Sequence, residues 1–527
     1  MPTPEVKVRT IVGLEIHVQL RTRTKLFCAC PVRYDAPPNT CICPVCLGHP
    51  GALPVINRRA FDYALLTGLA LNCRIAGHTR WDRKNYFYPD LPKNYQISQY
   101  DLPLATEGSF EIPFKGGSKH VRIQRVHLEE DAGKSIHDTP GCTLIDLNRA
   151  GTPLLEIVTE PDLVSADETY TFCVELQRLV THLGVSEGVM QLGQMRFEPN
   201  VNLVIEFDGA EFRTPIAEIK NLNSFRHVRD AIEYESKRQL ASWHDDHEYR
   251  LDIKANENRG WNADRGITEF QRGKEAAHDY RYFPDPDLAP IDVTEKMIED
   301  VRVFLPELPV ARRRRFVDEF SLAVEDAETI VNHRPTADLF EQVIAAGGPA
   351  DIVGKQFVNV WQKLAKDRNV KVTDLGVDSQ CMAELAKITA DGTINKSAAN
   401  QLAKVLVTRS DPPASDRVSD PLQRESLSHP EPQASACANP PAPAPLQLAQ
   451  ELGLVQVQDT AATEAWVDQV FAENPKAVQD ACTNPKKVKA AAGFLRGQVM
   501  KLSGGKADPK IVGERIGQRL AKLTQQK

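Results

Sequence analysis

The sequence lacks both the long apolar runs and the leader that would direct a chain into or across a membrane. No stretch approaches the roughly 18 consecutive apolar residues of a membrane span. Residues 1–9 carry charges and no apolar segment, so a secretory signal is not predicted. We therefore expect a soluble cytoplasmic protein with no membrane role. In that reducing compartment its 11 cysteines should stay out of disulfides.

Several catalytic motifs are missing as well. Gly133-Lys134-Ser135 resembles the end of a phosphate-binding loop, but Leu128 occupies the position where that loop requires its first glycine. The sequence has no Gly-x-Ser-x-Gly motif and no Gly/Ser-rich stretch of the amidase kind that would supply a serine nucleophile. We therefore do not expect this chain to hydrolyse an amide by itself.

An overall excess of positive charge is also absent. The formal net charge of −7 argues against a protein that coats nucleic acid by bulk electrostatics. The C-terminal end differs, because residues 486–527 hold eleven Lys/Arg against two Asp/Glu. That end could meet a phosphate backbone, and a solvated helix face is the alternative. The basic residues that it offers are Lys486, Lys487, Lys489, Arg496, Lys501, Lys506 and Lys510.

A length of 527 residues predicts two or three domains. Residues 1–294 alternate strand-like runs with Pro/Gly turns and some helices, which predicts an α+β domain. Residues 295–390 show helical spacing, with helices expected over 307–320, 337–346 and 352–367. Residues 391–527 form a last helical module. It is interrupted at about 410–445 by a Pro-rich insertion that we expect to be disordered, because it has too few apolar residues to form a core.

Five cysteines crowd between residues 28 and 46. Cys28 and Cys30 form one close pair, and Cys43 and Cys46 form another after a loop of twelve residues. Two thiolate pairs at this spacing are typical of tetrahedral zinc, which can close a loop too small to have its own core. Cys41 is an alternative to Cys43 as the fourth ligand. A closed four-cysteine site has no open position, so its role is expected to be structural.

Acidic residues and one histidine mark a second candidate site. Glu15 and His17 alternate with Val12, Leu14, Ile16 and Val18, so they are expected on the polar face of a half-buried strand. Further carboxylates stand at 129–131 and at Glu156, which lies within an apolar run where a lone charge is costly to bury. Carboxylates with one imidazole suit a hard divalent ion such as Mg²⁺. From the spacing alone, an ordinary solvated or salt-bridged role remains the competing interpretation.

Six longer segments, read in order, resemble one family. They are residues 12–20 (VGLEIHVQL), 82–90 (DRKNYFYPD), 127–134 (HLEEDAGK), 146–156 (DLNRAGTPLLE), 220–225 (KNLNSF) and 279–287 (DYRYFPDPD). Over nearly its whole length, apart from the insertion, the chain is similar to the GatB/GatE family. The members of that family are the tRNA-handling, B-type subunits of the tRNA-dependent glutamyl/aspartyl amidotransferases.

This resemblance implies a catalytic cradle built on a mixed or antiparallel sheet, then an all-α domain and an all-α YqeY-like tail that contacts tRNA. It also implies a reaction. ATP would phosphorylate the side-chain carboxylate of Glu on tRNA(Gln), of Asp on tRNA(Asn), or of both, and ammonia would displace the phosphate. The ammonia would come from an amidase (glutaminase) partner, which forms a heterotrimer with this chain and a small third protein.

Roles for individual residues follow from the same resemblance. Glu15, His17, Glu130 and Glu156 would hold Mg²⁺. Lys84, Asn85 and Arg149 would act on phosphate or substrate, and Tyr86, Tyr88 and Asp90 would line the same pocket. One segment departs from the family pattern: residues 197–200 read Phe-Glu-Pro-Asn where many relatives have Cys-Asp/Glu-Ala-Asn, so Glu198 is left out of the expected site.

Two other functions compete with this one. A non-catalytic zinc protein that binds RNA as a scaffold would explain the cysteines and the basic tail, but not the acidic strands. A free-standing ligase that uses ammonia directly would need no glutaminase partner. ATP hydrolysis that depends on misacylated tRNA distinguishes the scaffold from an enzyme, and the nitrogen donor distinguishes the two enzymes.

Overall fold

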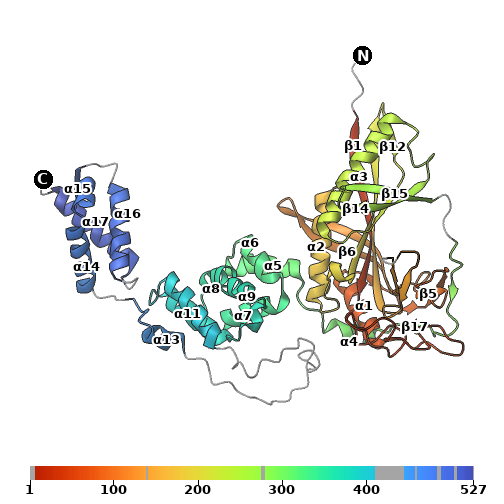
Figure 1. The fold of residues 1–527 in the computed structure, drawn as a ribbon, viewed down its shortest axis with the longest axis horizontal. Helices are drawn as coiled ribbons and strands as arrows, with labels where there is room; N and C mark the ends of the chain where they lie inside the picture. The colour runs from red at the N-terminus through yellow and green to blue at the C-terminus, as the bar shows by residue number, and fades with distance from the viewer. Residues whose placement is uncertain are drawn as a thin grey trace. The chain divides into compact units, whose positions relative to one another are not determined.

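The computed structural model describes residues 6–137, 140–274, 279–409, 444–456, 460–483, 488–503 and 507–525. The chain divides into two compact units, Met1–Arg312 and Arg313–Lys527. Among these described residues strands occur in the first unit alone (Figure 1), and the predicted α+β class is confirmed. Residues 410–443 of the predicted insertion lie outside the described residues.

A ten-stranded sheet forms the framework of the first unit, with the strand order β15-β14-β13-β11-β1-β10-β7-β6-β2 and β12 paired to β11. All neighbours are antiparallel except β13 and β14, which run parallel. The strands are β1 (Lys7–Gln19), β2 (Arg74–Ile75), β6 (Ala105–Phe114), β7 (Gly117–Glu130), β10 (Pro153–Thr159), β11 (Met195–Phe207), β12 (Ala210–Arg213), β13 (Ala217–Lys220), β14 (Asn256–Asn262) and β15 (Ile267–Lys274).

Strand β1 lies at the centre of this sheet, between β10 and β11. The predicted alternation is confirmed, because Val12, Leu14, Ile16 and Val18 are fully buried in the core while Glu15 and His17 are only partly covered. The opposite face is therefore left for polar side chains from β1 and its neighbours.

Helices cover the apolar face of the sheet. They are α1 (Arg58–Ala70), α2 (Ala166–His182), α3 (Phe225–Asp245) and α4 (Glu295–Arg302), with a short 3₁₀ turn η1 (Met190–Leu192). Helices α2 and α3 pack on each other and against β6 and β11, and α4 packs on α1. Hence α4, which follows residue 294, belongs to the core of the first unit. The domain boundaries expected at 294 and 390 stay predictions.

Small sheets stand at the edge of the framework. One is β16-β4-β5, and the others are β17-β3 and β8-β9. Their bounds are β3 (His78–Thr79), β4 (Asp82–Asn85), β5 (Tyr95–Ser98), β8 (Lys134–Ile136), β9 (Leu144–Asp146), β16 (Phe283–Pro284) and β17 (Ile291–Asp292). Strand β5 is tied to the end of β7, because Ile97 N donates to the Glu130 carboxylate (3.1 Å) and Gln96 Nε2 donates to the Glu130 carbonyl (2.7 Å).

Helices make up the second unit as far as the structure describes it, with α5 leading into it from the first. They are α5 (Pro309–Phe320), α6 (Val324–Val331), α7 (Arg334–Ala345), α8 (Ala350–Gln356), a π turn η2 (Phe357–Trp361), α9 (Gln362–Asp367), η3 (Val372–Leu375), α10 (Ser379–Ala390), α11 (Lys396–Arg409), α13 (Pro445–Glu451), α14 (Thr460–Glu473), α15 (Pro475–Thr483), α16 (Val488–Leu502) and α17 (Pro509–Gln525).

The described helices of the second unit form two hydrophobic clusters. One spans α5 to α13 and includes the fully buried Leu448 and Ala449 of α13, and the other is formed by α14 to α17. None of the helices in the described ranges is long and apolar enough to cross a membrane.

Candidate active site

The register of the central strands gathers polar side chains on one face of the sheet. His17 of β1 pairs with Glu156 of β10 on one side and with Arg196 of β11 on the other. Glu156 in turn pairs with His127 of β7. Since directly paired residues share a face, these four side chains form a row across four strands. Residues two positions away, such as Glu15 and Glu129, join the same face.

His17 is the centre of this acidic cluster. Its Nε2 lies 3.2 Å from Glu129 Oε1, 3.7 Å from Glu156 Oε2 and 3.7 Å from Glu15 Oε1. His127 Nε2 is 3.5 Å from Glu156 Oε2. The structure thus brings together three of the four residues expected to hold Mg²⁺, namely Glu15, His17 and Glu156.

The carboxylates of this cluster repel one another, and burial makes their charge more costly. Burial, followed by the neighbouring Glu156, raises the pKa of Glu15 to about 7. Burial would lower the pKa of His17, but its hydrogen bonds with Glu129 and Glu156 outweigh that effect and raise the pKa well above the usual value. Three carboxylates around one imidazole form a site that an added cation would relieve. The donor atoms of Glu15, His17 and Glu156 lie within 4.8 Å of one another, as do those of His127, Glu129 and Glu156, so the residues fit a metal ion.

Glu130 does not join this cluster. It follows Glu129 on β7, and successive strand residues point to opposite faces. Its carboxylate forms a buried ion pair with Lys93 and accepts a hydrogen bond from Ile97 N. Glu129 and His127 take part in the cluster instead. Sequence reasoning included the carboxylates at 129–131 in the candidate site but assigned Glu130 to the metal, and it missed His127, although the two-residue spacing of His127 and Glu129 on one strand was a usable sign.

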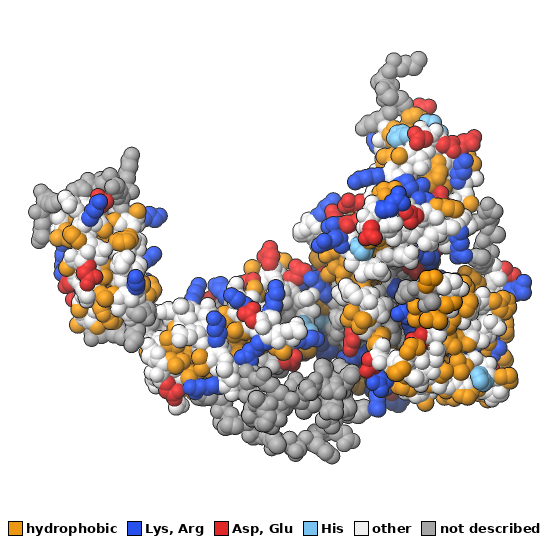
Figure 2. Space-filling view, viewed as in Figure 1, with side chains coloured by type: hydrophobic (Ala, Val, Ile, Leu, Met, Phe, Trp, Pro, Cys, Tyr) orange, Lys and Arg blue, Asp and Glu red, His pale blue; other side chains and the backbone are white. Residues whose placement is uncertain are grey.

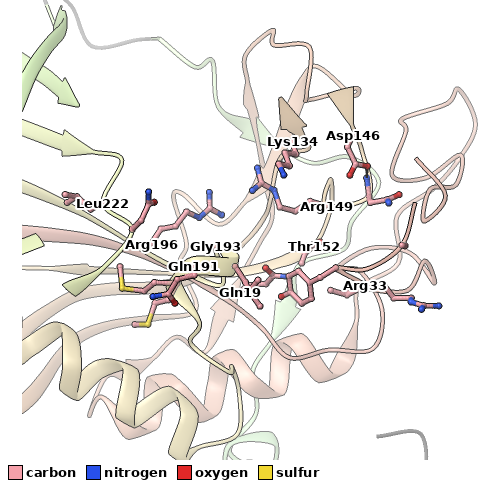
Figure 3. A pocket seen from close by; sticks show the side chains of 18 residues that line it. Gln19, Arg33, Lys134, Asp146, Arg149, Thr152, Gln191, Gly193, Arg196 and Leu222 are labelled. Atoms are coloured by element: carbon pink, nitrogen blue, oxygen red, sulfur yellow. Dashed lines mark hydrogen bonds between the residues drawn. The ribbon is translucent and has the colours of Figure 1, made fainter. Parts of the chain in front are cut away.

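A cationic pocket of about 460 Å³ adjoins the cluster, a volume within the range of small-molecule sites. It begins at Gln19, two residues beyond His17, and is lined by Lys134, Arg149 and Arg196. In Figure 3 these three side chains approach one space from separate elements, whereas Arg33 points away from them. Of these residues only Arg149 was expected from the sequence.

Asp131 holds two of these cations in position. Its buried carboxylate lies 2.9 Å from Arg196 Nη2 and 3.4 Å from Arg149 Nε. Arg149 also donates to the carbonyls of Ala132 (3.0 Å) and Gly133 (2.7 Å). The charge of Asp131 raises the pKa of Arg196, and the contacts of Asp131 orient both guanidinium groups next to the acidic cluster.

The other expected substrate residues lie on and after β4 and do not line this pocket. Lys84 Nζ sits 5.0 Å over the ring of Tyr280, and Asn85 Nδ2 donates to the carbonyl of Arg281 (2.7 Å). The Tyr86 ring meets Tyr280 edge-on. Tyr88 is exposed, and the carbonyl of Asp90 accepts from Gly133 N (2.8 Å). These residues form a surface separate from the cationic pocket, and Asp90 connects it to the segment after β7.

The cysteine cluster is compact. The sulfur atoms of Cys28, Cys30, Cys43 and Cys46 all lie within 4.8 Å of one another, so this cluster could bind a metal ion. Cys41 is not among them, and its backbone N–H donates to Asn148 Oδ1 (2.8 Å). The fully buried Lys25 places its ammonium 3.6 Å from Cys46 Sγ and 3.3 Å from the Leu147 carbonyl. A hydrogen bond from Cys28, with a smaller effect of Lys25, lowers the pKa of Cys46 to about 4.

The basic tail is only partly described. Lys489, Arg496, Lys501 and Lys510 are exposed, on or next to α16 and α17, while Lys486, Lys487 and Lys506 lie outside the described residues. On the visible face of α14–α17 in Figure 2, basic side chains are interspersed with acidic and hydrophobic ones.

Glu198, which departs from the family pattern in its surroundings, has a partner of its own. It pairs with Lys220 (2.5 Å), and Lys220 also binds Glu218 (2.6 Å). On the neighbouring strand β1, Glu15 lies directly opposite Glu198. Glu198 therefore borders the acidic cluster, and Lys220 offsets its charge.

Comparison with known proteins covers both units. A family model described as the GatB/GatE catalytic domain matches residues 10–299, and one described as the GatB domain matches residues 338–520. Relatives named as B-type subunits of aspartyl/glutamyl-tRNA(Asn/Gln) amidotransferase include those of Geotalea daltonii and Moorella thermoacetica. Both are 42% identical, over 519 and 518 residues respectively, covering 98% of this chain and 100% of the relative. That of Thermomicrobium roseum is 43% identical over 517 residues, or 96% and 97% of the two chains.

Proposed function

The chain belongs to the GatB/GatE family, and from this premise we propose that it activates the side-chain carboxylate of a misacylated tRNA for amidation. The substrates are Glu-tRNA(Gln), Asp-tRNA(Asn) or both, and the products are Gln-tRNA(Gln) and Asn-tRNA(Asn). ATP phosphorylates the carboxylate, and ammonia then displaces the phosphate. The observation that carries the proposal is an acidic cluster at His17 directly beside a pocket into which Lys134, Arg149 and Arg196 converge.

This reaction requires both the acidic cluster and the cationic pocket. An ionised carboxylate is a poor electrophile, because its charge is shared by two oxygens and neither can leave. When one carboxylate oxygen attacks the γ-phosphorus, ADP leaves and an acyl phosphate forms. Ammonia attacks its carbonyl carbon, inorganic phosphate leaves, and a proton is released. Such phosphoryl transfer depends on positioning and on offsetting the charge of the phosphate oxygens.

Residues of this chain can perform those tasks. We assign Glu15, His17, Glu129 and Glu156 as the side chains that would hold Mg²⁺, which when bound would supply positive charge to the phosphate oxygens. Glu129 thus replaces Glu130 of the sequence-based set. Arg149, Arg196 and Lys134 would bind phosphate oxygens from the other side, and Asp131 would keep the two guanidinium groups oriented.

The remaining assignments follow from the family and from surface chemistry. Ammonia would come from an amidase (glutaminase) partner, in a cytoplasmic heterotrimer with a small third protein. The relatives' names describe one subunit of an amidotransferase, which supports an enzyme of several chains. The four gathered cysteines would bind a structural Zn²⁺. The exposed tail residues Lys489, Arg496, Lys501 and Lys510, together with Lys486, Lys487 and Lys506, would contact tRNA phosphates.

The test compares two neighbouring glutamates in the chain reconstituted with its partner proteins. Wild type should release phosphate from ATP only with misacylated tRNA, and form Gln or Asn. Glu129→Gln should lower that rate at least about a hundredfold, because one charge that holds the cation is lost. Glu130→Gln is the matched control and should retain far more activity, since Glu130 pairs with Lys93.

Two outcomes would contradict parts of this proposal. An absence of phosphate release with misacylated tRNA would favour the non-catalytic RNA-binding scaffold, and phosphate release that does not depend on misacylated tRNA would refute the proposed reaction. Normal turnover by Glu129→Gln with an inactive Glu130→Gln would restore the set expected from sequence and refute our metal assignment.

A further inference from the structure

Four tyrosines form a continuous row in the first unit. Tyr100 and Tyr282 stack face to face, with ring centroids 4.0 Å apart and planes 11° from parallel. Tyr280 then meets both Tyr282 and Tyr86 edge-on, each at 6.2 Å. Tyr100 is 55% exposed, so one end of the row is open to solvent. The other end is half-buried.

The row lies close enough to the acidic cluster for the charge of Glu129 to affect it. Tyr86 follows β4 and Tyr100 follows β5, and β5 is hydrogen-bonded to the end of β7, where Glu129 and Glu130 lie. Burial raises the pKa of both Tyr86 and Tyr282, and the charge of Glu129 adds to each shift. The same carboxylate that binds His17 therefore acts on the tyrosines.

Three hydroxyl groups and one ammonium along the row have no hydrogen-bonding or ion-pair partner within the described ranges. The hydroxyl groups of Tyr86, Tyr100 and Tyr282 make no hydrogen bond there. The ammonium of Lys84, also half-buried, contacts the Tyr280 ring but no carboxylate in that part of the chain. A half-buried cation and three free hydroxyls beside exposed aromatic faces are groups that a ligand can satisfy.

Aromatic faces beside one cation are the chemistry by which proteins bind an unpaired base and its phosphate. We propose that the exposed face of the Tyr100–Tyr282 stack receives the terminal, unpaired base of the misacylated tRNA, with Lys84 facing its phosphate. This inference rests on the proposed function. The aminoacyl group is attached to the ribose of that nucleotide, so a base held on the row would direct the reacting carboxylate toward His17 and Glu129.

The adenine of ATP could stack on the same tyrosines. The number of positive charges nearby distinguishes ATP from the tRNA terminus as the ligand of the row. ATP carries three phosphates, which match the cationic pocket of Lys134, Arg149 and Arg196. Among the described residues, two cations of the tyrosine row make no ion pair, the half-buried Lys84 and the exposed Arg281 between Tyr280 and Tyr282. This is less positive charge than the three convergent cations of the pocket provide, and it suits the few phosphates that precede a terminal nucleotide. We therefore assign the row to tRNA.

The experiment is a thermodynamic cycle on the full-length chain, with affinity measured for tRNA with and without its terminal adenosine. Wild type should bind the complete tRNA about tenfold more tightly, a factor in the range of one base–aromatic stack. Tyr100→Ala should lose that preference and bind both tRNAs equally. Tyr100→Phe, which keeps the ring, should retain it. Phe270→Ala removes an equally exposed aromatic of β15 (59% exposed) and should behave like wild type.

Other outcomes overturn the assignment. If Tyr100→Ala keeps the wild-type preference for the terminal adenosine, the row does not bind that base. If Tyr100→Ala instead binds ATP more weakly than wild type, measured without tRNA, the row binds the adenine of ATP. Failure of the proposed function is separable, because it would appear as wild-type enzyme without tRNA-dependent phosphate release.

Discussion

Glu129 and Glu130 show how far single residues can be judged from sequence. Both are acidic and adjacent, and both are almost fully buried. The family pattern placed the metal ligand in this segment, and the strand's alternation then decides which carboxylate faces His17. The phase of β7 follows from its pairing with β10, where Glu156 pairs with His127. That pairing is a long-range contact, so local sequence could not supply it.

A buried glutamate away from the site should control acid stability. The side chain of Glu235 is fully buried and binds Arg238 Nη2 (2.6 Å), Thr268 Oγ1 (2.7 Å) and Gln239 Nε2 (2.9 Å). Burial opposes its ionisation, but the hydrogen bonds and charge of Arg238 outweigh burial and lower the pKa. Glu235→Gln should reduce the free energy of unfolding at neutral pH by about 3 kcal/mol, because Arg238 loses its buried partner.

The contribution of Glu235 to the free energy of unfolding should decrease at acidic pH. A carboxyl whose pKa is lower in the folded state stabilises the fold above its unfolded value near 4.5, and that contribution is lost as pH falls through the folded value. Wild type should thus lose more stability than Glu235→Gln between about pH 5 and about pH 3, as measured by urea unfolding. Equal losses in the two proteins would show that Glu235 is not paired as described.

Lys25 offers a test of the cysteine cluster. Its ammonium is completely buried, and its polar contacts in the described structure are Cys46 Sγ and the Leu147 carbonyl. A buried cation needs a nearby negative charge, which four thiolates on Zn²⁺ would supply. Lys25→Met should weaken zinc retention against a chelator by about tenfold or more. Lys7→Met, at an exposed lysine, is the control; equal retention by both variants would remove Lys25 from the zinc site.

Helices and strands could be predicted from the sequence where one periodic pattern of apolar residues dominates. The alternation of β1 followed from its own residues, because one face is fully apolar. The helix expected over 352–367 is present as α8 and α9, but a π turn at Phe357–Trp361 joins them. That turn fully buries Phe357 and Trp361 in the helical core, a tertiary demand that spacing does not reveal.

The small sheets were beyond sequence reasoning for a different reason. Strand β16 consists of Phe283 and Pro284 and pairs with Arg83 and Asp82, about 200 positions earlier in the chain. Two-residue strands have no periodicity of their own. Their pairing nevertheless assembles the tyrosine row and brings Lys84 to Tyr280. The residues on and after β4 were thus named from the family resemblance, while their arrangement in space required the structure.

At the scale of the whole molecule, the tail should supply sequence-independent tRNA affinity. A truncation after Arg409 would remove Leu448 and Ala449, which are fully buried in the helical core. A truncation after Gln456 keeps them and removes α14–α17 with the basic residues. The truncated chain should bind tRNA more weakly, with a flatter dependence of log Kd on log salt concentration, because phosphate contacts are lost. An unchanged salt dependence would mean that the tail makes no phosphate contacts.

The fate of the carboxylate oxygen shows whether ATP phosphorylates the amino-acid carboxylate itself. Misacylated tRNA carrying ¹⁸O in the side-chain carboxylate is incubated with the assembled enzyme, ATP and glutamine, and the released phosphate is analysed by mass spectrometry. If an acyl phosphate forms, the bridging oxygen leaves with phosphate, so each amide formed should yield one phosphate containing one ¹⁸O. Amide formation with unlabelled phosphate would contradict the account.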